Sequence, residues 1–386
     1  MDGVRGFRFA GVAAGIKQKG GPDVGLIVAD QPCAAAAVFT RNRVPAAPVV
    51  LSRAALKKNK GRARALVVNS GNANALTGDF GRQDAERMAA WTAELLGADQ
   101  RDVLVASTGV IGVRLPMEHI ESGISLATEN LEEGNFDRFA TAILTTDRAA
   151  KIAQYSVDGA RLLGCTKGAG MIAPNMATTL TFVVTDANLA PGPLARELGQ
   201  ACDSTFNSIA VDGDTSTNDM ILVMASGVGP RVSPGAFGGA LEELLANLAR
   251  QLMHGGEGVH HVVAVEVRGA STTNVARKVA RAIAISPLVK TAIAGADPNF
   301  GRILAAAGNA GVGIKPARLA LDLDDVPIVR GGVPVDDPQR EARARDVMGR
   351  LEYSIRVDLG TGRAFARYLA CDLSHEYVTI NADYRT

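Results

Sequence analysis

The stretch Ala177-Thr178-Thr179 could supply both a nucleophile and its base, provided that the chain is cut within it. A threonine hydroxyl is a poor nucleophile unless a base lies beside it. If the chain were cut between Ala177 and Thr178, the new terminus would carry both groups. Its α-amino group, with a pKa of roughly 7.7 to 8.0, is partly neutral near physiological pH and can accept the proton of its own residue's hydroxyl. The alternative from residue types alone is that Thr178 merely begins the β-branched run TTLTFVV.

Three other polar motifs adjoin short apolar runs. In ASTGVIG (106–112), Thr108 and Gly109 would let backbone N–H groups approach a ligand and form an oxyanion hole, and a plain turn at the end of a strand is the alternative. NSGNANALTG (69–78) is either a turn or one wall of a polar pocket. FNSIAVDGDTSTND (206–219) lacks the closing Glu of a calcium loop, so we expect a polar network there instead of a cation site.

Cofactor and metal motifs are weak in this sequence. GAGMIA (168–173) matches the dinucleotide fingerprint loosely, but Pro174 and Asn175 follow at once, so no helix can open there to hold a pyrophosphate. The five histidines form no recognisable triad, and the four cysteines are far apart with no CxxC pair. We therefore expect no metal, and buried thiols in a reducing compartment; a nucleotide-binding module using GAGMIA remains an alternative.

Strands and helices alternate along the first two thirds of the chain. The runs at 65–69 and 102–107 read as buried strands, and residues 81–97 between them carry a helical apolar stripe that Gly97 should terminate. Ser233 and Pro234 predict the start of another helix. With 386 residues, 47% hydrophobic content and many small residues, an α/β protein of layered helices and sheets follows.

The last third suggests more strands. Residues 262–267 predict a strand and 271–286 a helix. Residues 352–373 look like a hairpin joined at Gly360-Thr361-Gly362, and 374–386 like a last strand and tail. The charged segment DDPQREARARD predicts a solvated loop or short helix.

Charge and hydropathy exclude several classes of partner. Lys+Arg 41 against Asp+Glu 40 gives a net charge of +1, which argues against nucleic acid or an anionic membrane and favours a small metabolite. There is no signal-like apolar segment at the start and no uninterrupted span of about 18 apolar residues. We expect a cytoplasmic protein.

Blocks from end to end of the chain resemble the ornithine acetyltransferase family, also called bifunctional glutamate N-acetyltransferase. They are GFRFAGVAAGIK, AAAAVFTRNRVPAAPVVLSR, NSGNANA, ASTGVIG, ILTTD, KGAGMIAPNMATTL, VDGDTSTND, SPLVKTAIAGADPNFGRILAAAG and CDLSHEYVTINADYRT. This family cuts itself before the threonine of its NMAT motif. The resemblance thus implies an α chain of residues 1–177 and a β chain of 178–386, usually assembled as α2β2. It also implies a mixed α/β layered fold, like that of N-terminal-nucleophile hydrolases in layout but with its own topology.

The resemblance further implies ping-pong acyl transfer in arginine biosynthesis. Thr178 would take the acetyl group from N2-acetylornithine and pass it to glutamate, with Thr108 and Gly109 as the oxyanion hole. Lys167 would face the substrate with Thr145 or its neighbour Thr146. Further substrate contacts implied by the family are Glu257, Asn381 and Thr386.

Two alternatives accompany this assignment. The family needs no bound cofactor, but its members are either monofunctional or also accept acetyl-coenzyme A as a donor. A self-processing hydrolase, an aminopeptidase or amidase, is the second candidate activity. One departure stands out: the family usually continues its Gly-Glu-Gly loop with Ala-Thr-Lys, whereas this chain has His260 and His261 after Val259.

Overall fold

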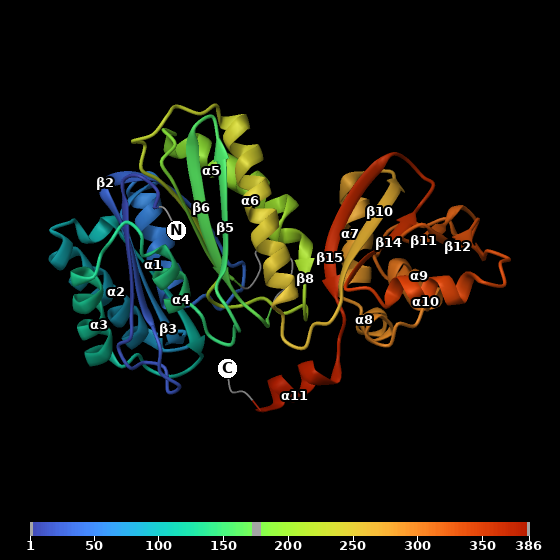
Figure 1. Cartoon of the computed structure of the whole chain (residues 1–386), viewed down its shortest axis with the longest axis horizontal. Coiled ribbons are helices and arrows are strands. Elements are labelled where there is room, and N and C mark those ends of the chain that lie inside the picture. Colours follow the sequence, from blue (N-terminus) through green and yellow to red (C-terminus); the bar gives the residue numbers. More distant parts are fainter. Residues whose placement is uncertain (1–2, 172–178, 384–386) are drawn as a thin grey trace. The chain divides into compact units, whose positions relative to one another are not determined.

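The computed structural model describes residues 3–171 and 179–383, which form two compact units (Figure 1). The first unit contains the described chain up to Asn207 together with Asp214–Leu252. The second contains Ser208–Gly213 and the described chain from Met253 onward. Each unit contains both strands and helices, so the mixed α/β class predicted from the sequence is confirmed.

An eight-stranded mixed sheet forms the centre of the first unit. β1 (Phe7–Val12) pairs with one part of the long strand β2. The other strands follow in the order β4 (Val103–Val110), β3 (Arg62–Asn72), β2 (Val24–Phe39), β9 (Met220–Ala225), β7 (Leu180–Thr185), β6 (Ala160–Lys167) and β5 (Lys151–Val157). Strands from both sides of the predicted cut therefore belong to one sheet.

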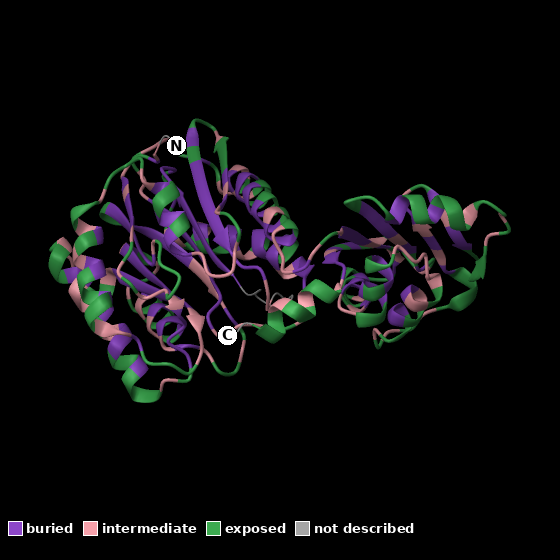
Figure 2. Cartoon of the chain, turned by 60° about the horizontal axis from the view of Figure 1, so that its bottom comes forward, coloured by how far each residue is buried: buried purple, intermediate pink, exposed green. Residues whose placement is uncertain are grey.

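Helices cover this sheet because its central strands are apolar on both faces. Along β2, Leu26 and Val28 pack with the helices α2 and α3, whereas Ile27 packs on the opposite face with Phe136 and neighbouring residues of α4. Figure 2 shows the resulting buried strands between partly exposed helices. The helices of the first unit are α1 (Ala47–Lys58), α2 (Gly78–Leu96), α3 (Met117–Glu129), α4 (Phe136–Ala142), α5 (Pro191–Ser204) and α6 (Pro234–His254), with short 3-10 turns at Gln100–Asp102 and Phe206–Ser208.

The strands nearest the predicted cut are β6, β7 and β9. Every residue of β7 and of β9 is buried, and the two strands run parallel, while β6 pairs with β7 antiparallel. In this register Leu180 lies opposite both Lys167 of β6 and Met220 of β9. The last residue of β6 and the first residue of β9 therefore flank the first residue of β7.

The second unit is built on a seven-stranded sheet. Its strands lie in the order β13 (Val333–Pro334), β12 (Val326–Arg330), β11 (Ala320–Leu323), β14 (Glu352–Asp358), β10 (Val262–Ala270), β15 (Ala364–Cys371) and β8 (Ile209–Ala210). Helix α7 (Thr273–Ala284) packs on β10 and β15. The other helices are α8 (Pro287–Ala294), α9 (Phe300–Gly308), α10 (Arg340–Met348) and α11 (His375–Asp383), with a 3-10 turn at Pro316–Arg318.

Several elements lie where the sequence predicts them. Helix α2 ends at Gly97, which adopts a left-handed conformation with φ of 59°. The Ser233 hydroxyl accepts from the N–H of Ala236 at the start of α6, and Thr272 accepts from Val275 at the start of α7. Strong local signals, a cap and an apolar stripe, specify these elements.

The predicted hairpin over 352–373 is wrong. Its two strands exist as β14 and β15, but they do not pair with each other, because β10 lies between them, parallel to β14 and antiparallel to β15. The connection passes the end of β10, where Leu359 N–H donates to the Arg268 carbonyl and Thr361 N–H to the Gly269 carbonyl. The alternating pattern predicted the two strands correctly, but each of them pairs with β10 and not with the strand next to it in the sequence.

The predicted last strand is also wrong, because residues 375–383 form helix α11. The Ser374 hydroxyl accepts from the N–H of Tyr377, as a residue at a helix N-terminus does. Asn381 lies one turn after Tyr377 and donates to its carbonyl oxygen at 3.0 Å. The local cap outweighs the β-branched residues that suggested a strand.

Candidate active site

Lys167 is the centre of the polar cluster in the first unit. It is the last residue of β6 and only 9% exposed. Its ammonium Nζ donates to Oγ1 of Thr108 at 2.7 Å and to Oγ1 of Thr145 at 3.2 Å. The fold thus brings three of the predicted site residues together from three separate segments. It also favours Thr145 over Thr146 as the threonine that meets Lys167.

Thr108 and Gly109 lie in the last residues of β4, which continues through Val110 instead of ending at residue 107. Thr108 is 7% exposed and lies opposite Ser70 of the parallel strand β3. Gly109 has a φ of +130°, and a Cβ placed there would lie 2.3 Å from the carbonyl carbon of Gly71. Only glycine can therefore follow Thr108 while the two strands stay this close.

Asn218 holds the two strand ends in place. Its Nδ2 donates to the carbonyl oxygens of Ala73, at 2.6 Å, and of Ser107, at 2.8 Å. The end of β3 itself is braced in a similar way, since Asn69 Nδ2 donates to the carbonyl of Asn72, the last residue of the strand. The polar network predicted for this Asp- and Thr-rich motif is confirmed at Asn218, and the described residues contain no cluster of three or more potential metal ligands.

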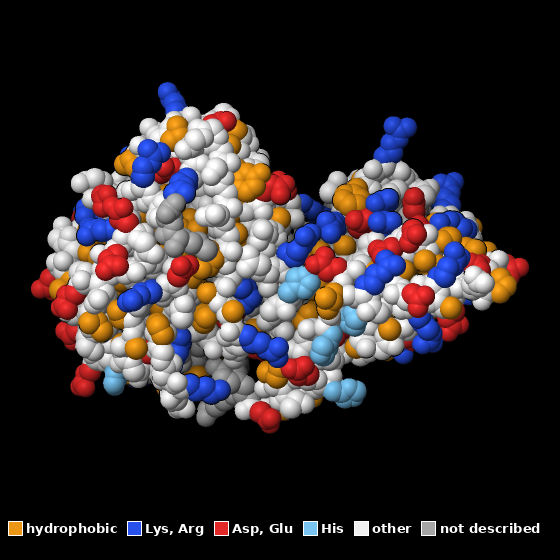
Figure 3. All heavy atoms as spheres, in the orientation of Figure 1, with side chains coloured by type: hydrophobic (Ala, Val, Ile, Leu, Met, Phe, Trp, Pro, Cys, Tyr) orange, Lys and Arg blue, Asp and Glu red, His pale blue; other side chains and the backbone are white. Residues whose placement is uncertain are grey.

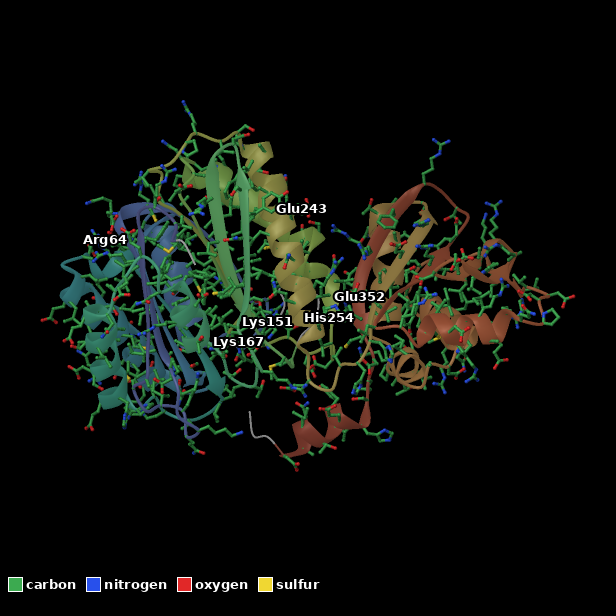
Figure 4. All side chains as sticks on the ribbon, viewed as in Figure 1. Arg64, Lys151, Lys167, Glu243, His254 and Glu352 are labelled. Atoms are coloured by element: carbon green, nitrogen blue, oxygen red, sulfur yellow. The ribbon has the colours of Figure 1, made fainter. Side chains whose placement is uncertain are left out.

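Asp147 and Lys151 form a buried ion pair beside Lys167, with side chains 0% and 8% exposed. Asp147 also accepts from the N–H of Gly168 at 2.9 Å. Burial by itself raises the pKa of Asp147, but the charges of Lys151 and Lys167 outweigh it and lower the pKa below its ordinary value. Figure 4 shows Lys151 and Lys167 at the same end of β5 and β6. Sequence analysis missed this pair, although Asp147 ends the ILTTD block four residues before Lys151.

Lys17 adds a third ammonium group to this region. The buried carboxylate of Asp23 accepts from the N–H groups of Ala14, Ile16 and Lys17 and so fixes the loop that carries Lys17. Burial lowers the pKa of Lys17 and Lys167 lowers it further, against the opposing charges of Asp23 and Asp147. The ammonium groups of Lys17, Lys151 and Lys167 thus lie close enough to act on one another and on Asp147, and a carboxylate of a bound molecule is the kind of group that such ammonium groups bind.

Asp219 is a second carboxyl group that sequence analysis did not single out. It immediately precedes β9, is 2% exposed, and interacts with the N–H of Thr179 and the hydroxyl of Thr40. Burial raises its pKa well above the ordinary value, and the nearby charge of Lys167 opposes the shift without cancelling it.

The second unit contains two more predicted site residues. Nδ2 of Asn381, on α11, donates to Oε2 of Glu257 at 2.9 Å. The loop that carries Glu257 is fixed to the same helix, because the Ser374 hydroxyl donates to the Gly258 carbonyl at 2.6 Å. Gly258 has a φ of +65°, and a Cβ there would lie 2.4 Å from the N–H nitrogen of Tyr377. The structure thus brings Glu257 and Asn381 together.

His260 and His261, which depart from the family pattern, are held by Asp372. The buried carboxylate of Asp372 accepts the backbone N–H groups of both histidines, at 2.9 and 3.0 Å. The His260 ring contacts the other Asp372 oxygen at 3.2 Å, and the His261 ring lies 2.7 Å from the Arg350 carbonyl. The backbone contacts would remain with other side chains, so the loop's path does not depend on imidazole rings.

Three predicted residues, Ala177, Thr178 and Thr386, lie outside the described part of the chain. Their assignments stay predictions. Thr179, which follows Thr178, is described, and the next residue, Leu180, lies opposite Lys167 in the pairing of β7 with β6.

Comparison with known proteins decides the family. The model of the ArgJ family matches residues 8–386. The chain belongs to the ArgJ family. It is 47% identical to the arginine biosynthesis bifunctional protein ArgJ of Geobacter sulfurreducens, over 99% of this chain and all of that one. It is 45% identical to the protein of the same name from Syntrophotalea carbinolica, over 99% of each chain. A crystal structure of arginine biosynthesis bifunctional protein argJ from Bacillus halodurans is 38% identical, with a TM-score of 0.50, covering 53% of this chain and 98% of that one.

Membership of the ArgJ family confirms the resemblance drawn from the motif blocks.

Acidic and basic side chains are interspersed over the face shown in Figure 3, in keeping with the near-zero net charge. Within the described ranges no helix is both long and apolar enough to span a bilayer. The four cysteines are free and buried as predicted, and burial raises the pKa of Cys33 to about 12, so this thiol is not an activated nucleophile.

Proposed function

We propose that this ArgJ-family chain is a self-processing glutamate N-acetyltransferase of arginine biosynthesis. It moves an acetyl group from N2-acetylornithine to glutamate and yields ornithine and N-acetylglutamate. The observation that carries this proposal is the buried ammonium of Lys167, bonded to the hydroxyls of Thr108 and Thr145 at the start of β7. Lys167 lies opposite Leu180, and in the sequence Leu180 follows by two residues the threonine that the family uses as its nucleophile.

The first half-reaction acetylates the enzyme. The chain cuts itself between Ala177 and Thr178, and the new α-amino group takes the proton from the Thr178 hydroxyl as its oxygen attacks the acetyl carbonyl. Thr108 and Gly109 stabilise the resulting oxyanion, for which preorganised donors contribute about 3 kcal/mol each. The carbon–nitrogen bond to ornithine then breaks, and the proton held by the α-amino group passes to the departing amine.

The second half-reaction reverses these steps with glutamate. Its neutral amine attacks the acetyl ester, the ester bond breaks, and the proton lost by the amine returns to the Thr178 oxygen. Lys167 and Thr145 bind the α-carboxylate that both substrates share, because a buried ammonium with hydroxyl partners suits a carboxylate. Glu257, Asn381 and Thr386 complete the recognition of the substrate, Glu257 by engaging an amine.

The remaining features of the proposal concern donors and assembly. Since relatives are named bifunctional, acetyl-coenzyme A serves as a second donor, with no resident cofactor. The 1–177 and 178–386 chains stay associated as α2β2 in the cytoplasm. Pairing of β6 with β7 and of β2 with β9 supports this association, because each pair joins strands from opposite sides of the cut.

Intact-mass measurement of purified protein tests the proposal. We expect fragments of 177 and 209 residues, and one acetyl group on the Thr178 fragment after incubation with N2-acetylornithine alone; added glutamate should clear it. Thr178→Ala should remain one chain and never become acetylated, whereas Thr178→Ser should retain some of both reactions. An intact wild-type chain with full activity would contradict the proposal. Stoichiometric acetate release without glutamate would favour the hydrolase.

A further inference from the structure

Lys17 is a cation of the candidate site to which the proposed reaction gives no role. It lies in the loop between β1 and β2 and is half-buried. Among the described residues, its Nζ donates one hydrogen bond, to the Pro22 carbonyl at 2.6 Å. An ammonium group has three N–H donors, so two of them can bind another group.

The loop that carries Lys17 is fixed by Asp23, whose side chain is buried. Its carboxylate accepts from the N–H groups of Ala14, Ile16 and Lys17, at 2.6 to 3.1 Å. The carbonyl oxygen of Asp23 accepts from the N–H of Ser70, near the end of β3. The backbone of Lys17 is therefore held in place, which lowers the entropy cost of ordering its long side chain on a ligand.

The stem of Lys17 packs beside the strand ends that carry Thr108. Gly71 of β3 lies opposite Gly109 of β4, and a Cβ placed at Gly71 would lie 3.2 Å from Cγ of Lys17. Thr108, the residue before Gly109, accepts from Nζ of Lys167 at 2.7 Å. The side chain of Lys17 thus contacts the same strand pair that presents Thr108 to Lys167.

The charged groups around Lys17 agree with this placement. Lys167, Asp147 and Asp23 all lie near enough to act on its ammonium group. Both of these carboxylates have other partners, however, since Asp23 binds three backbone N–H groups and Asp147 pairs with Lys151. A carboxylate brought by a substrate therefore suits the two remaining donors of Lys17.

The two substrates of the proposed reaction differ at the ends of their side chains. The side chain of N2-acetylornithine ends in an amine, which is positively charged near neutral pH, whereas that of glutamate ends in a second carboxylate. The α-carboxylate that both share is assigned to Lys167 and Thr145. The carboxylate that remains belongs to glutamate alone, and a cation attracts it while repelling the amine of ornithine.

We propose that Lys17 binds the side-chain carboxylate of glutamate and so selects the acceptor of the acetyl group. Its ammonium group donates to this carboxylate and disfavours the side chain of ornithine, so glutamate replaces ornithine in the site after the first half-reaction. Lys17 takes no part in bond making or proton transfer. This inference rests on the proposed function, since it assumes that glutamate is the acceptor.

Lys17→Met tests the proposal in the cleaved enzyme, because methionine can still pack on Gly71 but carries no charge. The Michaelis constant for glutamate should rise about 10- to 100-fold, as expected for lost hydrogen bonds between ionised groups, and that for N2-acetylornithine should change less than about 3-fold. Lys17→Arg should restore much of the affinity for glutamate. Lys19→Met, at an exposed lysine of the same loop, is the matched control and should behave as wild type.

Glutamine as acceptor separates charge recognition from a structural role. It has the shape of glutamate but ends in a neutral amide, so wild type should prefer glutamate in kcat/KM, and Lys17→Met should reduce this preference about 10-fold or more. An unchanged preference, or equal losses with both acceptors, would overturn the inference for Lys17 alone. If the wild-type enzyme transfers no acetyl group from N2-acetylornithine to glutamate, the proposed function itself fails and the inference fails with it.

Discussion

The two groups of predicted site residues differ in how they are held. Lys167, Thr108 and Thr145 lie in or beside buried strands and bond to one another. Glu257 and Asn381 pair on a loop and a helix that has no buried residue. Groups that stabilise charge in a transition state work best when they are fixed beforehand, whereas substrate recognition tolerates adjustment. We infer that the first group determines turnover and the second determines substrate affinity.

Removing the counter-ion of the buried cluster should have the largest effect. Asp147→Asn leaves the ammonium of Lys151 buried without its partner, so the free energy of unfolding should fall by about 3 to 5 kcal/mol. Denaturant unfolding measures this change. Asp147→Asn/Lys151→Met, which removes both charges, should recover most of the loss. If the double variant is as unstable as the single one, the ion pair is not the cause.

The same pair predicts the response to acid. Asp147 has a folded-state pKa below its unfolded value near 3.9, so its contribution is present above that pH and is lost as pH falls through the folded pKa. Melting temperatures measured from pH 7 down to pH 2.5 should therefore fall more steeply in wild type than in Asp147→Asn. Parallel curves would show that Asp147 binds a proton equally well in both states.

Thr108→Ala should lower turnover by about 10²-fold in fully cleaved enzyme, with a smaller change in the Michaelis constants. The hydroxyl both contacts Lys167 and lies where the oxyanion is expected to form. Thr108→Ser keeps the hydroxyl and should retain most activity. Unchanged steady-state kinetics in Thr108→Ala would mean that this strand end is only structural.

Asn381→Ala should act mainly on affinity. It removes one hydrogen bond to Glu257, a loss of about 1 kcal/mol, so the Michaelis constant of one substrate should rise roughly 5-fold with turnover nearly unchanged. Thr379→Ala, on the same helix, is the matched control because its hydroxyl bonds only within the helix, to the carbonyl of His375. A larger fall in turnover than in affinity would contradict the division between the two groups.

The smallest effect should come from His260→Thr/His261→Lys. Asp372 accepts backbone N–H groups at these positions, and these contacts persist with any side chain. The Michaelis constant for ornithine or glutamate should change by no more than about 3-fold, and self-cleavage should not change. If neither parameter moves, the departure from the family pattern is neutral; an effect on cleavage would refute this assignment.

Local signals in the sequence were sufficient for several elements and for the family. Caps and apolar stripes specify α2, α6 and α7, and the motif blocks carried the resemblance that selected Thr108, Lys167 and Thr145. The caps and apolar stripes depend on residues within a few positions of each other, and the resemblance depends on the residue identities within the motif blocks. They could therefore be predicted before any strand was paired.

Only the tertiary structure decided which distant groups meet. Lys167 and Thr108 are 59 residues apart, and nothing in either motif specifies their hydrogen bond. The same is true of β10, which lies between β14 and β15, and of Asp219, whose neighbour Thr179 directly precedes the parallel strand β7. Residue types and local spacing determine what a segment can form. Strand order and register, set by burial of the whole sheet, determine the neighbours that give a carboxyl or ammonium group its charge and its role.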